Sequence, residues 1–179
     1  MKAWAVGIAL FTAAVLGYLF VLPQGSSEGL RTTAGPDRSE VFYWTDPGLE
    51  PDPCVAAWLL TRYVTPGARV VIRSQSPDGI PFDVPGCELQ RRPGLSTSDM
   101  VMRTYGIDDP LAAALADVVR ELELKPWTTN DEEFFVRVRS GLAEAINASE
   151  SDEACLQRAM EFLDSLREER PVLPTREAP

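Results

Sequence analysis

The residues of this chain that could perform chemistry are three cysteines, a run of hydroxyl side chains and several carboxylates. The sequence of 179 residues contains no histidine. This excludes catalysis by Ser-His-Asp or Cys-His groups and every metal site that needs an imidazole ligand. Ser96, Thr97 and Ser98 therefore lack the usual base, and Lys125 stands in no Ser-x-x-Lys pattern. We predict no catalytic residue, no metal site and no cofactor, and the residues favour a non-enzymatic protein over an enzyme.

Acidic residues outnumber basic residues in this chain. The sequence has 27 Asp and Glu against 17 Lys and Arg, which gives a formal net charge of -10. Binding to a phosphate backbone depends on a basic surface, so this balance argues against a nucleic-acid-binding protein. We expect no nucleic-acid partner.

The N-terminal run from Ala3 to Leu22 is predicted to cross a membrane. It has 20 residues without a charge, and at about 1.5 Å per residue a helix of this length spans a bilayer core. Lys2 precedes it, so the positive-inside rule places the rest of the chain on the extracytoplasmic side. The alternative is a cleaved secretory signal, which would release a secreted protein. The long apolar run and the lack of an A-x-A site favour an uncleaved single-pass anchor.

The predicted anchor takes up residues 1–23. The sequence that follows it predicts one globular domain with two irregular flanks. Residues 24–39 are rich in Gly, Ser, Thr and Pro and are typical of a flexible tether. Residues 40–170 carry the helical and strand patterns of a folded body. Residues 171–179 are polar and proline-rich, so we expect a disordered tail.

The folded body is predicted to be mainly helical. Asp52 before Pro53 and Asp109 before Pro110 each combine a capping side chain with a proline in the first helical turn. Ser96 and Asp99 stand in a capping-box arrangement, and Gly106 ends that helix. Helices are expected at about 52–63, 96–105, 111–124, 131–147 and 151–169, with short strands at 40–44 and 68–72. The predicted fold class is mainly α with a few short strands (α+β), as a single domain behind a transmembrane helix.

The middle of the chain resembles the C-terminal domain of the chromate-resistance protein ChrB. The segment DPCVAAWLLTRY, residues 52–63, is similar to a family helix in which an Asp stands six residues before a Trp-Leu pair. The segment PFDVPGCEL, residues 81–89, is similar to the family signature Phe-Asp-x-Pro-Gly-x-Glu-Leu. YGIDDPL, residues 105–111, and Val118-Val119-Arg120 complete a match that runs from about Asp52 to Arg120.

The chain departs from this family at positions that carry chemistry in its relatives. Gln90-Arg91-Arg92 stands where relatives carry a histidine, Ser96 where they carry a cysteine, and Ala56-Ala57 where they carry Cys-Pro. The resemblance therefore implies that metal or chromate chemistry through histidine or thiol groups has been lost at these positions. A membrane anchor also replaces the DNA-binding region of the chromate regulators, so we expect no role in transcription.

Seven polar positions of the family segments are retained: Asp52, Arg62, Asp83, Glu88, Asp99, Arg103 and Arg120. Arg62, Arg103 and Arg120 could converge on a tetrahedral oxyanion, because guanidinium groups bind such oxygens with paired hydrogen bonds. In the alternative, each arginine pairs with a carboxylate such as Asp83 or Asp99 and only holds the fold together. The four carboxylates Asp52, Asp83, Glu88 and Asp99 could also support this site or bind a hard cation.

Two of the three cysteines fall in the segments that resemble the family. Cys54 and Cys87 are the candidate disulfide pair, because the resemblance covers both segments as one unit and an exported body permits disulfides. Such a bridge leaves Cys155 unpaired. The alternative is three buried thiols that act as small apolar residues.

The sequence as a whole predicts a membrane-anchored, extracytoplasmic domain of the chromate-resistance type. We expect a non-enzymatic binding or accessory module, with a small oxyanion such as chromate as its candidate ligand and an unidentified membrane protein as a possible partner. The alternatives are a divergent enzyme, either an oxyanion reductase or a hydrolase that uses thiols or carboxylates, and a structural envelope protein whose site has been lost.

Overall fold

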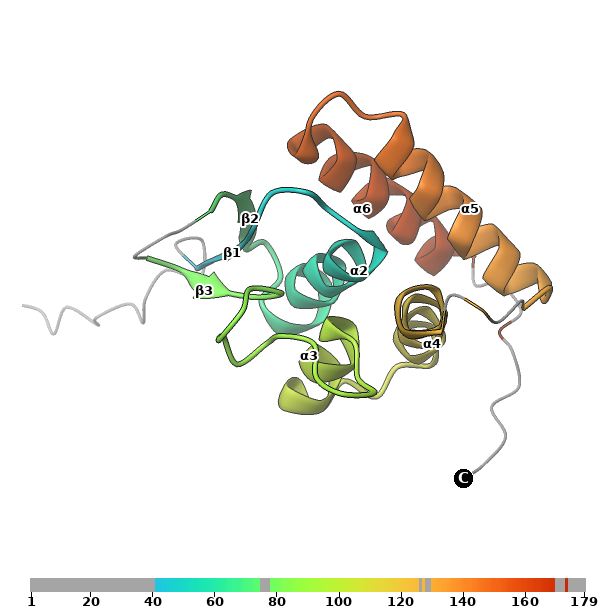
Figure 1. Ribbon diagram of the computed structural model, residues 1–179, viewed down its shortest axis with the longest axis horizontal. Coiled ribbons are helices and arrows are strands. Elements are labelled where there is room, and N and C mark those ends of the chain that lie inside the picture. The colour runs from blue at the N-terminus through green and yellow to red at the C-terminus, as the bar shows by residue number, and fades with distance from the viewer. Residues whose placement is uncertain (1–40, 75–77, 126, 128–129, 170–172, 174–179) are drawn as a thin grey trace, which may run out of the picture. The chain divides into compact units, whose positions relative to one another are not determined.

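The computed structural model describes residues 41–74, 78–125, 127, 130–169 and 173 of the chain (Figure 1). The chain divides into two units, Met1–Gly35 and Pro36–Pro179, and every described residue belongs to the second unit. The predicted anchor and the predicted tether lie outside the described residues. Within the described part, no helix combines the length and the apolar character needed to cross a membrane.

Three short parallel strands form the sheet of the domain. β1 (Phe42–Thr45) lies in the centre, between β2 (Arg69–Ile72) and β3 (Ile80–Pro81). Two parallel strands need a crossover connection, and between β1 and β2 this is the helix α2 (Pro51–Leu59). A π-helical turn, Leu60–Val64, continues α2. β1 and β2 confirm the two predicted strands, whereas β3 was not expected because a two-residue strand has no alternation to detect.

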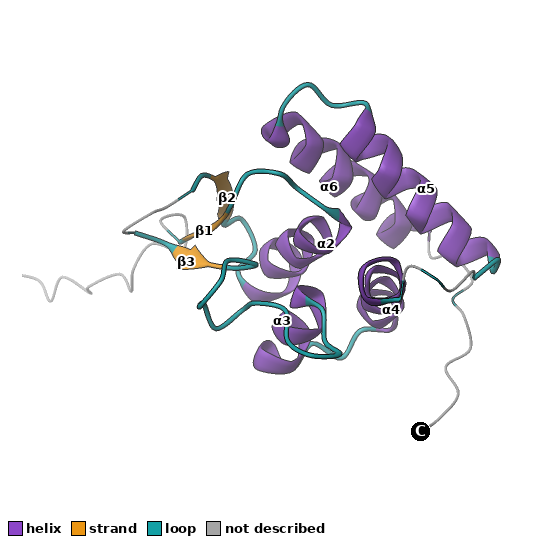
Figure 2. Ribbon diagram, in the orientation of Figure 1, coloured by secondary structure: helices purple, strands orange, loops and turns teal. Residues whose placement is uncertain are grey.

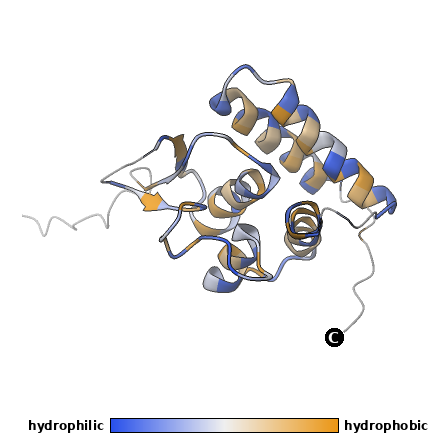
Figure 3. Ribbon diagram, in the orientation of Figure 1, coloured by the Kyte–Doolittle hydropathy of each residue, from blue (hydrophilic) through white to orange (hydrophobic). Residues whose placement is uncertain are grey.

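Four further helices complete the described part of the domain. They are α3 (Thr97–Tyr105), α4 (Pro110–Leu124), α5 (Glu133–Asn147) and α6 (Asp152–Glu169). Figure 2 shows the small sheet at one side of these helices. In Figure 3 hydrophobic and hydrophilic residues alternate along α5 and α6, as expected of helices with one face in the core. The prediction of a mainly helical domain with a few short strands is confirmed.

α2 is the central helix of the domain. It packs against α3, α4 and α6, and it lies between them in Figure 1. Its residues 52–59 are all buried, including the large side chain of Trp58. A helix that is enclosed on every side must be apolar all round, and α2 meets this condition except at Asp52. The buried Asp52 therefore requires a specific set of hydrogen bonds.

Two of the three predicted helix caps are present, and the third is different. Asp109 accepts the Ala112 backbone N–H at the start of α4, and Ser96 and Asp99 form the capping box of α3. The prediction that Asp52 caps its own helix is wrong. α2 begins at Pro51, its N-cap is Glu50 without a side-chain hydrogen bond, and Asp52 lies inside the first turn. From this position the Asp52 side chain points to another helix.

Candidate functional site

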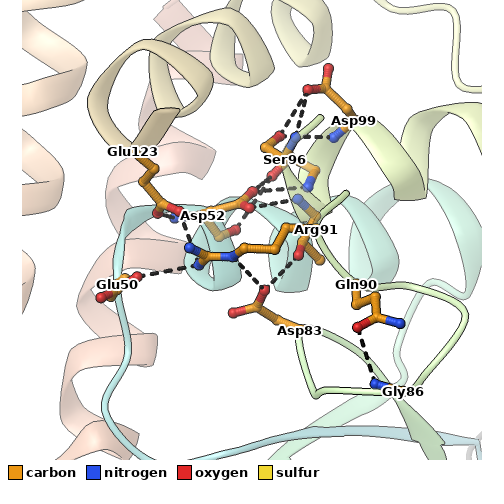
Figure 4. Close-up of polar contacts among 11 residues, drawn as sticks. Glu50, Asp52, Asp83, Gly86, Gln90, Arg91, Ser96, Asp99 and Glu123 are labelled. Atoms are coloured by element: carbon orange, nitrogen blue, oxygen red, sulfur yellow. Dashed lines mark hydrogen bonds and ion pairs between the residues drawn. The ribbon is translucent and has the colours of Figure 1, made fainter. Parts of the chain in front are cut away.

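Asp52 caps α3 from the neighbouring helix α2. Its Oδ2 accepts the backbone N–H of Thr97 at 2.6 Å, and its Oδ1 accepts the N–H of Ser98 at 2.8 Å and the Ser98 hydroxyl at 2.6 Å (Figure 4). The first N–H groups of a helix have no partner within the helix and lie at the positive end of its dipole, so a carboxylate is favoured there. Asp52 is completely buried. Burial raises its pKa, and the hydrogen bonds from Ser98 and Thr97 lower it, with a net upward direction.

Beside this cap, one arginine is surrounded by acidic residues, which we call the Arg91 cluster: Glu50, Asp52, Asp83, Arg91 and Glu123. Arg91 Nη2 lies 3.1 Å from Glu123 Oε2 and 3.3 Å from Glu50 Oε2, and its Nε lies 3.7 Å from Asp83 Oδ1. Figure 4 shows the guanidinium group between these three carboxylates, with Asp52 beside the Arg91 side chain. One positive charge thus faces four carboxyl groups, which is an excess of negative charge in a partly buried place.

The Arg91 cluster joins segments that are far apart in the sequence. Glu50 and Asp52 belong to the start of α2, Asp83 and Arg91 to the loop before α3, and Glu123 to the last turn of α4. Glu123 Oε1 also accepts the backbone N–H of Asp52 at 2.7 Å. The side chain of Glu123 is 9% exposed. A carboxyl group in this position must either stay charged against its acidic neighbours or hold a proton.

The surroundings of Glu123 raise its pKa above that of an exposed glutamate. Burial raises the pKa of Glu123 to about 7, with a further increase from the negative charge of Asp52, against the lowering effect of the Asp52 N–H and of Arg91. Burial also raises the pKa of Asp83, which accepts a hydrogen bond from the Thr97 hydroxyl. A carboxyl group with a pKa near 7 can take up or release a proton at neutral pH. Among the described residues, no group of acidic and cysteine side chains has the arrangement of a metal site.

Arg120 joins α4 to α3 through the capping box. Its Nε and Nη2 donate to the two oxygens of Asp99, with Nε at 2.9 Å, and its Nη1 donates to Asp117 Oδ1 at 2.8 Å. Burial raises the pKa of Asp99, but the hydrogen bonds from Arg120 and Ser96 outweigh it, and the net pKa is lowered. Arg120 thus has the structural pairing with Asp99 that the sequence offered as the alternative to an anion site.

Arg62 has a separate partner on α6. Its Nε and Nη2 donate to the two carboxylate oxygens of Asp164 at 2.9 and 2.7 Å, and Trp58 Nε1 donates to the same carboxylate at 2.8 Å. These bonds, first of all those from Arg62, lower the pKa of Asp164. Arg62 therefore links the end of the central helix to α6.

Arg103 and Arg120 line one surface pocket between α3 and α4. The pocket has a volume of about 360 Å³, and its lining includes Asp99, Met102, Arg103, Ile107, Ala116 and Arg120. Of the three arginines that the sequence proposed as an anion site, the structure brings these two together at the pocket, whereas Arg62 pairs with Asp164 of α6.

The four carboxylates that the sequence proposed as a site also do not all lie at one place. Asp52 and Asp83 meet in the Arg91 cluster, and Asp99 pairs with Arg120 instead. Glu88 is exposed on the loop, where its charge acts on Tyr105. Glu50 and Glu123 were missed. The available signal was Arg91 itself, a basic residue of the loop before α3.

The predicted Cys54–Cys87 disulfide is not present. All three cysteines are free thiols, with Cys54 and Cys155 buried and Cys87 half-buried. The reason is the rotation of the helix. Cys54 lies two residues after Asp52, about 200° around α2. Because Asp52 faces the start of α3, beside the loop that carries Asp83, Cys54 faces away from it and toward α6.

Comparison with known protein families matches residues 43–169 to the family described as ChrB, C-terminal domain. The match extends from β1 to the end of α6, so it includes α5 and α6, which lie beyond the segments of the sequence resemblance. No similar curated protein and no similar solved structure was found.

Proposed function

We propose, because this chain belongs to the family of the ChrB C-terminal domain, that it is a binding or accessory module of chromate resistance rather than an enzyme. Its ligand in this proposal is a small tetrahedral oxyanion such as chromate. The observation that carries the proposal is the pocket between α3 and α4, which presents Arg103 and Arg120 beside the apolar side chains of Met102 and Ile107.

The two arginines of the pocket have different parts in this proposal. Asp99 and Asp117 occupy three of the five N–H groups of Arg120, so these ion pairs fix its guanidinium at the pocket wall and offset much of its charge. Arg103 is exposed and forms no salt bridge within the described part of the chain. Arg103 is therefore the main source of charge for an anion, and Arg120 is a fixed second donor. Because Asp99 repels an anion, we expect modest affinity.

Removal of Arg103 tests the pocket. Calorimetry of the full-length chain with sulfate, which has the shape and charge of chromate but does not oxidise thiols, is expected to show binding that weakens as salt is added. Arg103→Ala is expected to reduce the affinity about tenfold, since a hydrogen bond to a charged group contributes about 1.5–3 kcal/mol.

The matched control is Arg137→Ala. Arg137 is an exposed arginine of α5 that pairs with Glu169, and its loss is expected to leave sulfate binding unchanged. If calorimetry detects no binding heat with sulfate, phosphate or chromate, the remaining interpretation is that the arginines only hold the fold together. Equal affinity in wild type and Arg103→Ala would exclude this pocket.

The location is the second part of the proposal. We propose that the run from Ala3 to Leu22 anchors the chain in the membrane and that the domain lies on the extracytoplasmic side, for the reasons of length and charge given by the sequence. A reporter enzyme that is active only in the cytoplasm, fused after Pro179, is expected to be silent, whereas a periplasmic reporter at the same position is expected to be active. The opposite pattern would reverse the topology. A purified chain that begins near Ser26 would indicate a cleaved signal instead of an anchor.

A further inference from the structure

The C-terminal part of the chain forms one wall of a second pocket, at the beginning of α4. This pocket has a volume of about 310 Å³ and shares no lining residue with the pocket at Arg103. Its lining combines small apolar residues with three aspartates: Asp108, Asp109, Pro110, Ala113, Ala114 and Asp117. Leu173 also lines it. A residue four positions beyond the end of α6 therefore lies against the first turns of α4.

Leu173 is packed against the hydrophobic core, although it stands in a polar and proline-rich part of the sequence. α6 ends at Glu169, and Pro171 cannot continue a helix because proline has no backbone N–H and its ring clashes with the preceding turn. From Glu169 to Leu173 an extended chain spans at most about 14 Å. The pocket is therefore within reach of the end of α6, and Leu173 joins this end to α4.

The charged residues in the lining of this pocket are all aspartates. One of them, Asp117, pairs with Arg120, and another, Asp108, is exposed. An apolar surface beside several carboxylates fits a group that has both a hydrophobic part and a positive charge. The chain itself contains such a combination, because Arg176 follows Leu173 by three residues. Three residues of extended chain span at most about 11 Å, so the Arg176 charge is within reach of the aspartates when Leu173 is in place.

We propose that this pocket is the docking site of the C-terminal segment of the same chain, residues 171–179, which acts as a strap between α6 and α4. Leu173 is its apolar anchor, and Arg176 is the counter-ion of the aspartates. Because the segment is joined to α6, docking is intramolecular, with an effective concentration in the millimolar range. Pro171 and Pro174 stand on either side of the anchor and restrict the undocked chain, which lowers the entropy lost on docking.

Trypsin digestion of the folded, full-length chain measures this docking. Trypsin cleaves after Arg176 but not after Arg170, because Pro171 follows it. Release of residues 177–179, followed by mass spectrometry, therefore reports the undocked segment. When docking equilibrates faster than cleavage, the rate of cleavage follows the population of the undocked form. We expect the wild-type chain to be cut at Arg176 about tenfold more slowly than a free peptide of residues 170–179, which corresponds to about 1.4 kcal/mol of docking free energy.

Variants of the anchor and of the pocket separate the two contributions. Leu173→Ala is expected to remove most of the protection, because it takes away the apolar anchor. Leu173→Met is the matched control and is expected to be cut at the wild-type rate, since methionine keeps the volume and the apolar character. Asp108→Asn is expected to speed the cleavage about twofold, because an ion pair at the surface contributes little. Asp131→Asn, at another exposed aspartate, is expected to leave the rate unchanged.

Three results would overturn the proposal. Cleavage of the wild-type chain at the rate of the free peptide would show that the segment is not docked, and this comparison needs no variant. Equal rates for wild type and Leu173→Ala would exclude Leu173 as the anchor. Protection that disappears when the protein is diluted would show that the pocket holds the C-terminal segment of a second copy instead of its own.

Discussion

Replacing Asp52 by asparagine is expected to lower the free energy of unfolding by about 3 kcal/mol. Both Asp52 oxygens are acceptors for buried donors, the backbone N–H of Thr97 on one side and the N–H and hydroxyl of Ser98 on the other. Asparagine keeps one oxygen but places an NH₂ group against the remaining donor. A buried donor without an acceptor costs about 1–3 kcal/mol, and the charge-assisted strength of the other bonds is lost as well. Urea denaturation followed by circular dichroism measures the change.

The same substitution at Asp109 is the control. Asp109 also caps a helix, by accepting the Ala112 N–H at the start of α4, but it is partly exposed and asparagine is an equally good N-cap. Asp109→Asn is therefore expected to change the stability by less than about 0.5 kcal/mol. If the two variants were equally stable, Asp52 would not be the connection that holds α3 on α2.

Replacing Glu123 by glutamine is expected to remove a large part of the pH dependence of stability. The pKa of Glu123 is raised from its ordinary value of 4.5 to about 7 in the folded state, chiefly by burial. Between these values Glu123 binds more protons in the folded chain than in the unfolded chain, so its contribution to stability falls as the pH rises from 4.5 to 7. A shift of this size corresponds to about 3 kcal/mol. Glutamine does not titrate and can still accept the Asp52 N–H, so the variant is expected to be more stable than wild type at pH 8.

The difference in stability between wild type and Glu123→Gln, measured at each pH, isolates the contribution of Glu123 from those of the other titrating groups. The pKa values of Asp52 and Asp83 are also raised, and those of Asp99 and Asp164 are lowered, so the pH profile of either protein alone contains several contributions. Denaturation midpoints at pH 4.5, 6, 7 and 8 are compared for Glu123→Gln and for the control Glu121→Gln, in the same helix. Parallel pH profiles for wild type and Glu123→Gln would show that Glu123 does not titrate in this range.

Both predictions concern one part of the molecule, the place where α2, α3, α4 and the loop before α3 meet. Asp52 contributes its carboxylate to α3 and its backbone N–H to Glu123, so it belongs to the helix cap and to the Arg91 cluster at once. A proton on Glu123 reduces the negative charge that Arg91 must offset. We expect this part of the domain, rather than the Arg62–Asp164 pair, to respond to pH near neutrality.

Several features of this protein follow from sequence alone, because they depend on neighbours along the chain. The Asp109 cap involves residues three apart, and so does the capping box of Ser96 and Asp99. The helical segments follow from apolar residues at intervals of three and four, and the ChrB resemblance follows from short motifs in a fixed order. In each case the interacting groups lie within one turn of helix, so their spacing in the sequence fixes their spacing in space.

The tertiary structure alone decided which distant groups meet. Glu123 and Arg91 lie 32 residues apart, Arg62 and Asp164 lie 102 apart, and Asp52 and Thr97 lie 45 apart. These contacts depend on how each helix is rotated about its own axis, and a rotation of 100° per residue sends neighbours such as Asp52 and Cys54 to different partners. The sequence restricts α2 to the core, because it is apolar on nearly every side. For the same reason it leaves the rotation of α2 open, and only the packing of α3, α4 and α6 around it fixes which side chain meets which partner.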